Sequence, residues 1–305
     1  MDKPYILHML TSAKNLSPFD VNMALDAGWI AAMPYTNVTV EEVQGLVQDA
    51  IFSRSPKTVK RTGFFIGGRD TLVAIQMLRA AKSSVVPPFE VSVFADPSGA
   101  FTTAAGMVAL SEQFLGQQHQ TDLKGKTVLV LGGTGPVGQI SAVLSAQAGA
   151  TVYLVGRQLE KAQQVADMCN REFGDGQTHI QAEADANKGE LIKTADVVYA
   201  TAAAGVQVLS AEMVAAAPQL KVAADVNAVP PSGIAGLSAR HKGTPIEGSR
   251  SGAVGIGALA IGNIKYQTQS RLLNLMRELK RETDKPVFIH FDLAFQTARE
   301  LVAPK

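Results

Sequence analysis

Residues 133–138 read Gly-Thr-Gly-Pro-Val-Gly, a G-x-G-x-x-G spacing that follows an apolar strand pattern at 127–131 and opens a helical pattern at 136–148. In such a loop the first glycine permits a tight turn, the second lets the backbone approach a pyrophosphate, and the third lets helix and strand pack closely. The helix N-terminus adds free N–H groups and positive potential. With a second strand pattern at 151–155, these residues predict a dinucleotide-binding loop made of Gly133, Thr134, Gly135, Pro136, Val137 and Gly138. A purely structural glycine turn is the alternative.

The end of the second strand pattern indicates which nucleotide is preferred. An NAD-selective site usually has Asp or Glu there to bind the ribose 2′-hydroxyl. This chain has Gly156-Arg157 instead, and Glu160 lies about one helical turn further along. A guanidinium suits a 2′-phosphate because it is planar, permanently charged and bidentate. Arg157 therefore favours NADP, with NAD also possible; a solvated residue at a helix start is the alternative.

The rest of the chain alternates strand and helix patterns, which implies mainly parallel sheets covered by helices. We predict two α/β domains with an active-site cleft between them. The first comprises residues 1–105 plus about 266–305, and the second is a Rossmann-type doubly wound domain at 106–265 that binds NAD(P). Strands are expected at 5–10, 29–33, 63–66, 91–94, 127–131, 151–155, 196–200 and 222–225, and helices at 18–27, 40–51, 70–82, 101–115, 136–148, 158–173 and 270–280.

Composition excludes several other classes of protein. Hydrophobic residues make up 46% of the 305 residues, so the chain is not disordered. A net charge of +1 without a basic block predicts no nucleic-acid partner. The single cysteine, Cys169, excludes an internal disulfide, and the scattered histidines give no metal motif. Residues 1–5 lack signal-peptide character and 253–264 is too short to span a bilayer, so a cytoplasmic protein without membrane partners is expected.

Polar or small residues follow several of the expected strands, where ligands of parallel sheets bind. Ala202 follows the strand at 196–200 and leaves room for a nicotinamide ribose, or belongs to a tight loop. Asn227 follows the strand at 222–225 and binds the carboxamide or the substrate, or caps a turn. The corresponding residues of the first domain are Ser17, Asp20, Asp96, Ser98 and Thr102, and Lys265 follows the glycine-rich stretch 252–262. A first-turn acid is the alternative for Asp20, and a solvated side chain is the alternative for Lys265.

Several segments together resemble the NAD(P)-dependent methylene-tetrahydromethanopterin dehydrogenases of bacterial one-carbon metabolism. The likeness covers nearly the whole chain and is weakest at about 158–191. Arg157 resembles the NADP-using members of that family. The segments are 6–10 (Ile-Leu-His-Met-Leu), 17–24 (Ser-Pro-Phe-Asp-Val-Asn-Met-Ala), 93–97 (Val-Phe-Ala-Asp-Pro), 101–103 (Phe-Thr-Thr), 225–231 (Asp-Val-Asn-Ala-Val-Pro-Pro) and 262–269 (Gly-Asn-Ile-Lys-Tyr-Gln-Thr-Gln).

The resemblance implies hydride transfer from methylene-tetrahydromethanopterin, or from the similar methylene-tetrahydrofolate, to NAD(P)+, giving the methenyl cation. This reaction needs two carbons held close and aligned, without an obligatory proton transfer. The resemblance makes Asp20 and Lys265 the catalytic anchors of the pterin, with Ser17, Asp96, Ser98, Thr102 and Asn227 as further substrate-binding residues. It also implies a homo-oligomer, a trimer or larger.

Two other functions fit parts of the sequence. A shikimate-type dehydrogenase acting on a small alcohol has the same two-domain plan, and it uses a Lys–Asp pair for proton transfer; Lys265 and Asp20 are candidates for such a pair. A non-catalytic NADP-binding regulator is the second alternative. The polar clusters of the first domain argue against it, since a sensor needs no second ligand site.

Overall fold

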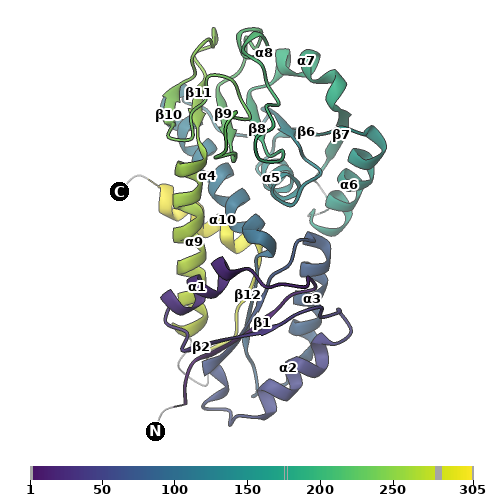
Figure 1. Ribbon diagram of the computed structural model, residues 1–305, viewed down its shortest axis with the longest axis vertical. Helices are drawn as coiled ribbons and strands as arrows, with labels where there is room; N and C mark the ends of the chain where they lie inside the picture. Colours follow the sequence, from purple (N-terminus) through teal and green to yellow (C-terminus); the bar gives the residue numbers. More distant parts are fainter. Residues whose placement is uncertain (1–2, 175, 177, 279–283, 304–305) are drawn as a thin grey trace. The chain divides into compact units, whose positions relative to one another are not determined.

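The computed structural model describes residues 3–174, 176, 178–278 and 284–303, and it divides the chain into two compact units (Figure 1). Unit 1 comprises residues 1–102 and 266–297, and unit 2 comprises residues 103–265 and 298–305. The division therefore falls inside three helices, α4 (Ala100–His119), α9 (Ala258–Glu278) and α10 (Phe291–Val302).

Unit 1 is built on a five-stranded, wholly parallel sheet with the strand order β2-β1-β3-β4-β12. Numbered along the chain, this order is 2-1-3-4-5, one of the two common doubly wound arrangements. Its strands are β1 (Ile6–Leu10), β2 (Ala31–Tyr35), β3 (Thr62–Ile66), β4 (Ser92–Ala95) and β12 (Phe288–Ile289). Its helices are α1 (Pro18–Asp26), α2 (Val43–Phe52) and α3 (Thr71–Ser84), together with the short helices η1 (Val59–Arg61) and η2 (Pro97–Gly99).

Helices cover both faces of the unit 1 sheet. The chain moves from β1 outward to β2, and then back past β1 to β3 and on to β4. Because crossovers between parallel strands are right-handed, this reversal places α1 on one face of the sheet and α2 and α3 on the other. The second half of α9 joins the α1 face, where Trp29 Nε1 donates to the Leu273 carbonyl at 3.3 Å. Trp29 and Met276 fill the space above Gly63 of β3, which has no room for a side chain.

Unit 2 is built on a seven-stranded sheet with the order β7-β6-β5-β8-β9-β11-β10. The first six strands are parallel and correspond to 3-2-1-4-5-6, the Rossmann order, with antiparallel β10 at one edge. The strands are β5 (Thr127–Leu131), β6 (Thr151–Gly156), β7 (Ile180–Ala184), β8 (Val197–Ala200), β9 (Val222–Asp225), β10 (Lys242–Pro245) and β11 (Val254–Ile256). The helices are α5 (Pro136–Gln147), α6 (Leu159–Glu172), α7 (Lys188–Leu191) and α8 (Ala211–Ala215), with η3 (Asp185–Asn187) and η4 (Ile192–Thr194).

The predicted α/β class with a Rossmann-type sheet is confirmed by these two strand orders. Four strands, β7, β10, β11 and β12, were not expected from the sequence. The glycine-rich stretch 252–262 is not one loop, because α9 already begins at Ala258, twelve residues before the expected start; its expected end at Lys280 lies outside the described residues. The expected helix at 40–51 begins at Val43, although Glu42 does accept the Thr39 N–H at 2.7 Å as its capping-box spacing predicts.

None of the helices among the described residues combines the length and apolar character needed to cross a membrane.

Candidate active site

The glycine loop of unit 2 connects β5 to α5 and contains Gly132, Gly133, Gly135 and Gly138. Only Gly135 has room for a side chain. Gly132 has a φ of +78°, and a Cβ there lies 2.6 Å from the backbone of Ala202. A Cβ on Gly133 meets Leu154 at 2.6 Å, and one on Gly138 meets the Cα of Gly133 at 2.7 Å. Close packing of α5 against the strand therefore requires Gly138, as predicted, whereas the left-handed turn belongs to Gly132 rather than Gly133.

Gly135 differs from its neighbours because the protein leaves the space beside it open. It is the N-cap residue of α5 with φ −80° and ψ 163°, a conformation open to any residue. A Cβ built on it lies 3.6 Å from the Gly132 carbonyl oxygen, an ordinary contact. Neither backbone strain nor packing explains this glycine. Glycine is an accepted N-cap residue, and its missing side chain also leaves room for a ligand at the N–H groups of the first helical turn, so the loop fits a dinucleotide pyrophosphate.

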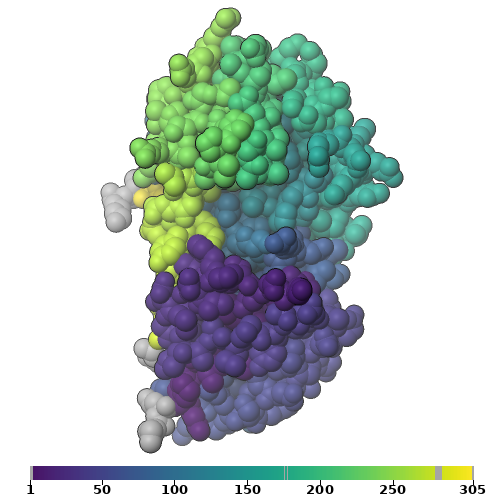
Figure 2. Space-filling view, in the orientation of Figure 1, coloured from purple at the N-terminus to yellow at the C-terminus, as the bar shows by residue number. Residues whose placement is uncertain are grey.

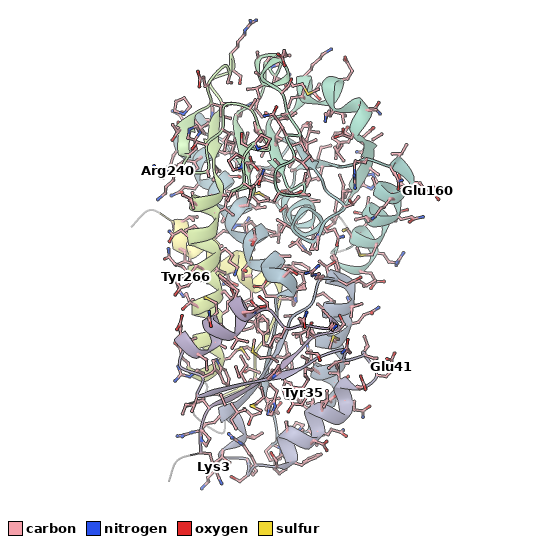
Figure 3. All side chains as sticks on the ribbon, viewed as in Figure 1. Lys3, Tyr35, Glu41, Glu160, Arg240 and Tyr266 are labelled. Atoms are coloured by element: carbon pink, nitrogen blue, oxygen red, sulfur yellow. The ribbon has the colours of Figure 1, made fainter. Side chains whose placement is uncertain are left out.

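The end of β6 carries an exposed cation and no acid. Arg157 follows Gly156 directly and is exposed. Among the described residues, no hydrogen bond or ion pair is found for its guanidinium. Glu160, three residues further along the chain, lies on the exposed first turn of α6 and points outward (Figure 3). The geometry leaves Arg157 available to a ligand, which is what recognition of a 2′-phosphate requires.

The loops after β8 and β9 complete the carboxyl edge of the unit 2 sheet. Ala202 lies against Gly132, and the Thr201 hydroxyl donates to the Leu131 carbonyl at 3.1 Å. Asn227 is buried and ties its own loop: Nδ2 donates to the Pro231 carbonyl, and Oδ1 accepts the Val229 N–H, both at 2.9 Å. These bonds correspond to the turn-capping alternative for Asn227, and its role toward a ligand stays a prediction.

Asp225, at the end of β9, also holds the loop that follows this strand. Its carboxylate accepts the backbone N–H groups of Asn227 at 2.9 Å and Gly233 at 2.6 Å. Burial raises the pKa of the Asp225 carboxyl, and these backbone hydrogen bonds oppose that increase. The carboxylate thus fixes the loop that holds Asn227.

Unit 1 has its own topological switch point, between β1 and β3, where the chain leaves neighbouring strands in opposite directions. Thr11 and Ser12 follow β1, and Gly67 and Gly68 follow β3. Gly68 has a φ of +108°, and a Cβ on it comes within 3.3 Å of the Ser12 hydroxyl. These four residues were not among the site residues predicted from the sequence. Their signal was available: a hydroxyl pair and a glycine pair, each directly after an expected strand.

Ser98 lies beside this switch point, on the loop after β4. It adopts a left-handed conformation with φ 54°, unusual for a residue other than glycine, and its hydroxyl donates to the Gly68 carbonyl at 2.8 Å. Asp96 is fully buried and caps α4 by accepting the N–H groups of Phe101 and Thr102 and the Thr102 hydroxyl, the last at 2.7 Å. Asp96 and Thr102 thus have a structural function here, and their contact with substrate stays a prediction.

Asp20 lies in the first turn of α1, at the same carboxyl edge of the unit 1 sheet. Ser17 is the N-cap residue, and its carbonyl accepts the Asp20 N–H at 3.1 Å. The Asp20 side chain is only 3% exposed. Its Oδ1 accepts a 2.9 Å hydrogen bond from Nε2 of Gln269, a residue 249 positions away. Asp20 is therefore a first-turn acid, as the alternative has it, whose carboxylate is also buried and hydrogen-bonded; its contact with substrate stays a prediction.

Lys265 lies within α9 rather than in a loop. It is half-buried and falls in the part of the helix that belongs to unit 2. Gln269 follows four residues later, so the two side chains lie one turn apart on the same side of α9. Tyr266, the next residue, is 46% exposed and is labelled in Figure 3.

Two titratable groups outside these loops, Cys169 and His8, have pKa values shifted by burial. Burial raises the pKa of the Cys169 thiol to about 12, which is unsuitable for a nucleophile. Burial lowers the pKa of His8, whose ring stacks on Phe64. Within the described part of the chain, no three His, Cys, Asp or Glu side chains are grouped so that they can hold a metal ion.

Two family models match the chain in consecutive segments. The N-terminal domain of methylene-tetrahydromethanopterin dehydrogenase matches residues 18–98, and shikimate / quinate 5-dehydrogenase matches residues 114–231. Among solved structures, the shikimate 5-dehydrogenase of Listeria monocytogenes is 13% identical, with a TM-score of 0.52 over 90% of this chain and 96% of that one. At this identity the likeness shows the fold alone, a two-domain α/β architecture.

The strand orders and the glycine loop thus define a two-domain, NAD(P)-binding α/β protein. A curated relative from Methylorubrum extorquens, NAD(P)-dependent methylenetetrahydromethanopterin dehydrogenase, is 44% identical over 97% of this chain and 98% of its own length. The bifunctional protein MdtA of the same organism is 39% identical over 80% of this chain and 84% of its own length. This chain belongs to the NAD(P)-dependent methylene-tetrahydromethanopterin dehydrogenase family, as the sequence analysis predicted.

Proposed function

We propose that this protein oxidises methylene-tetrahydromethanopterin to the methenyl form, using NAD(P)+ as the hydride acceptor. The observation that carries the proposal is the 44% identity, over nearly the full length of both chains, to a relative with that activity. The methylene carbon loses one hydrogen with two electrons, which nicotinamide C4 receives. No proton leaves the reacting carbon, so the residues of the protein have only to bind, align and stabilise charge.

The two sheets support separate sites for the two reactants. The Gly132–Gly138 loop and Arg157 hold the nucleotide at the carboxyl edge of the unit 2 sheet. The open space at Gly135 fits the pyrophosphate, and the exposed guanidinium fits a 2′-phosphate, so NADP is the preferred nucleotide. The pterin binds at the carboxyl edge of the unit 1 sheet, where Ser12, Gly68 and Ser98 present polar groups beside the switch point.

Asp20 and Lys265 are the polar anchors of the pterin in this proposal. Asp20 is held rigidly in a nearly dry environment, where its charge acts more strongly than in water. A carboxylate there favours a positive charge that develops during hydride loss. Lys265 contributes by binding and orienting the substrate.

Kinetics with two pterins and two nucleotides tests the proposal. Tetrahydromethanopterin and tetrahydrofolate derivatives, each with NADP+ and NAD+, are compared with a panel of alcohols that includes shikimate. We expect turnover of methylene-pterin and none of the alcohols. Turnover of an alcohol alone supports a shikimate-type dehydrogenase, and nucleotide binding without any turnover supports a regulator.

Family membership also supports a cytoplasmic enzyme and a homo-oligomer of three or more chains. Light scattering of the purified protein tests the second prediction directly.

A further inference from the structure

One side of α9 is bonded to the segment that begins with α1. Gln269 donates to Asp20, the Leu273 carbonyl accepts from Trp29, and Arg277 donates to the Ala27 carbonyl. The three α9 residues are spaced by four, so they follow one another along the same side of the helix. In Figure 2 the N-terminal residues, in purple, lie in front of the second half of α9 and hide most of it.

Gln269 is the member of this stripe that touches a proposed anchor of the substrate. Its side chain is fully buried, and Asp20 is 3% exposed, so water does not compete for the 2.9 Å hydrogen bond between them. Hydrogen bonds to charged groups are stronger than those between neutral groups. An amide donor also adds no positive charge of its own, so this bond orients the carboxylate without cancelling its charge.

We propose that Gln269 is a positioning residue for the reaction: its amide fixes the orientation of the Asp20 carboxylate, which acts on the developing methenyl cation. This proposal rests on the proposed function. It makes a distinct claim, namely that Gln269 contributes to turnover only through Asp20. A purely structural link between α9 and the segment that begins with α1, like that of Trp29 to Leu273, contributes to stability and not to turnover.

The test replaces Gln269 with Met, which keeps the length of the side chain and removes the donor. We expect kcat for methylene-pterin oxidation to fall at least about 10-fold, while nucleotide KM changes by less than about twofold. Gln269→Asn keeps an amide but is one methylene shorter, so an intermediate kcat is expected; it also carries the test if Gln269→Met does not fold.

Thr268→Val is the matched control. Thr268 is fully buried in the same helix, and among the described residues its hydroxyl finds no hydrogen-bond partner. Removing that hydroxyl leaves no donor or acceptor behind, so wild-type kcat and unchanged or higher stability are expected. A kcat loss in Thr268→Val equal to that in Gln269→Met contradicts the proposal, since any change at this part of α9 then has the same effect.

The decisive measurement repeats Gln269→Met in an Asp20→Asn background. If Gln269 acts through Asp20, the second substitution changes kcat by less than about twofold once the carboxylate is gone. An equal fold loss in both backgrounds, or wild-type kcat in Gln269→Met alone, overturns the proposal while leaving the proposed function intact. A wild-type enzyme inactive toward both methylene-pterins contradicts the proposed function, and the Gln269 proposal with it.

Discussion

A single substitution at Gly135 should remove nucleotide binding without changing the folding of the protein. Three other glycines of the loop, Gly132, Gly133 and Gly138, are required by packing, because a Cβ on any of them approaches protein atoms within 2.6–2.7 Å. At Gly135 the nearest atom is 3.6 Å away and φ is −80°. Gly135→Val therefore places its side chain in the space where a pyrophosphate approaches the backbone, and its Cβ makes only ordinary contacts with the protein.

The expected change in stability is small. Replacing glycine where the backbone suits an L-residue stabilises a protein by about 0.4–1 kcal/mol through the unfolded state. An apolar N-cap residue costs a similar amount relative to glycine. The two effects nearly cancel, so the free energy of unfolding of Gly135→Val should stay within about 1 kcal/mol of the wild type.

The expected loss of nucleotide affinity is much larger. A hydrogen bond from a helix N-terminus to a phosphate is charge-assisted and contributes about 1.5–3 kcal/mol, so losing one weakens binding about 10- to 150-fold. Blocking the approach of the whole pyrophosphate removes more than one such bond. We therefore expect NADP+ binding by Gly135→Val to be undetectable by calorimetry.

Gly138→Ala is the control, because it should lower the stability of the protein, whereas Gly135→Val should lower its affinity for the nucleotide. Its Cβ lies 2.7 Å from the Cα of Gly133 and from the Thr201 hydroxyl, and the backbone atom cannot move aside easily. Overpacking of this kind costs about 1–3 kcal/mol of stability. Urea denaturation and calorimetry on both variants decide the question. Wild-type nucleotide affinity in folded Gly135→Val, or destabilisation of both variants alike, refutes the reasoning.

Four further predictions follow from particular side chains. Arg157→Ala should weaken NADP+ binding by about 1.5–3 kcal/mol and leave NAD+ binding nearly unchanged; equal losses by calorimetry mean that Arg157 does not bind the 2′-phosphate. Asp20→Ala and Lys265→Ala should each lower kcat/KM for methylene-pterin at least ~10-fold, about 1.4 kcal/mol, and wild-type kinetics in folded variants contradicts both roles. Asp96→Ala should lower the free energy of unfolding by at least about 2 kcal/mol, because the buried cap of α4 is lost; wild-type stability in urea contradicts the capping role. Burial lowers the pKa of His8, so the folded state binds its proton more weakly than the unfolded state, and stability should fall as pH drops below 6.5; the loss should be smaller in His8→Gln, measured by denaturation at two pH values.

Much of the fold was predictable because its strongest signals are local. The apolar strands β5, β6, β8 and β9 fell at their expected positions. β7 was missed because Ile-Gln-Ala-Glu-Ala is a partly solvated edge strand with few β-branched residues. The start of α9 was misjudged because Gly257 and Gly262 suggest a loop. In the structure Gly262 lies inside the helix, a cost of about 1 kcal/mol relative to Ala that tertiary packing outweighs.

The candidate site was less predictable, because the hydrogen-bond partners of its residues cannot be read from their spacing in the sequence. Asp96 and Asn227 both look like polar residues presented to a ligand after a strand, yet both are occupied in holding their own loops. The periodicity of the sequence cannot distinguish a ligand-binding residue from one that holds its own loop. Only the hydrogen-bond partners seen in the structure distinguish them. Asp20 shows the reverse: its partner Gln269 is 249 positions away, so no local pattern reveals that the carboxylate is buried.

The two strand orders bear on the choice between an enzyme and a sensor. A protein that only detects a nucleotide needs one switch point, which the β5/β8 boundary of unit 2 supplies. Unit 1 has a second one between β1 and β3, and Ser98 adopts an unfavourable backbone conformation there, with its hydroxyl bonded to Gly68. Such strain persists only where the surrounding structure compensates for it, and it is concentrated at functional sites. A second ligand at this edge is what a hydride transfer between two molecules requires, so the structure of unit 1 favours catalysis over sensing.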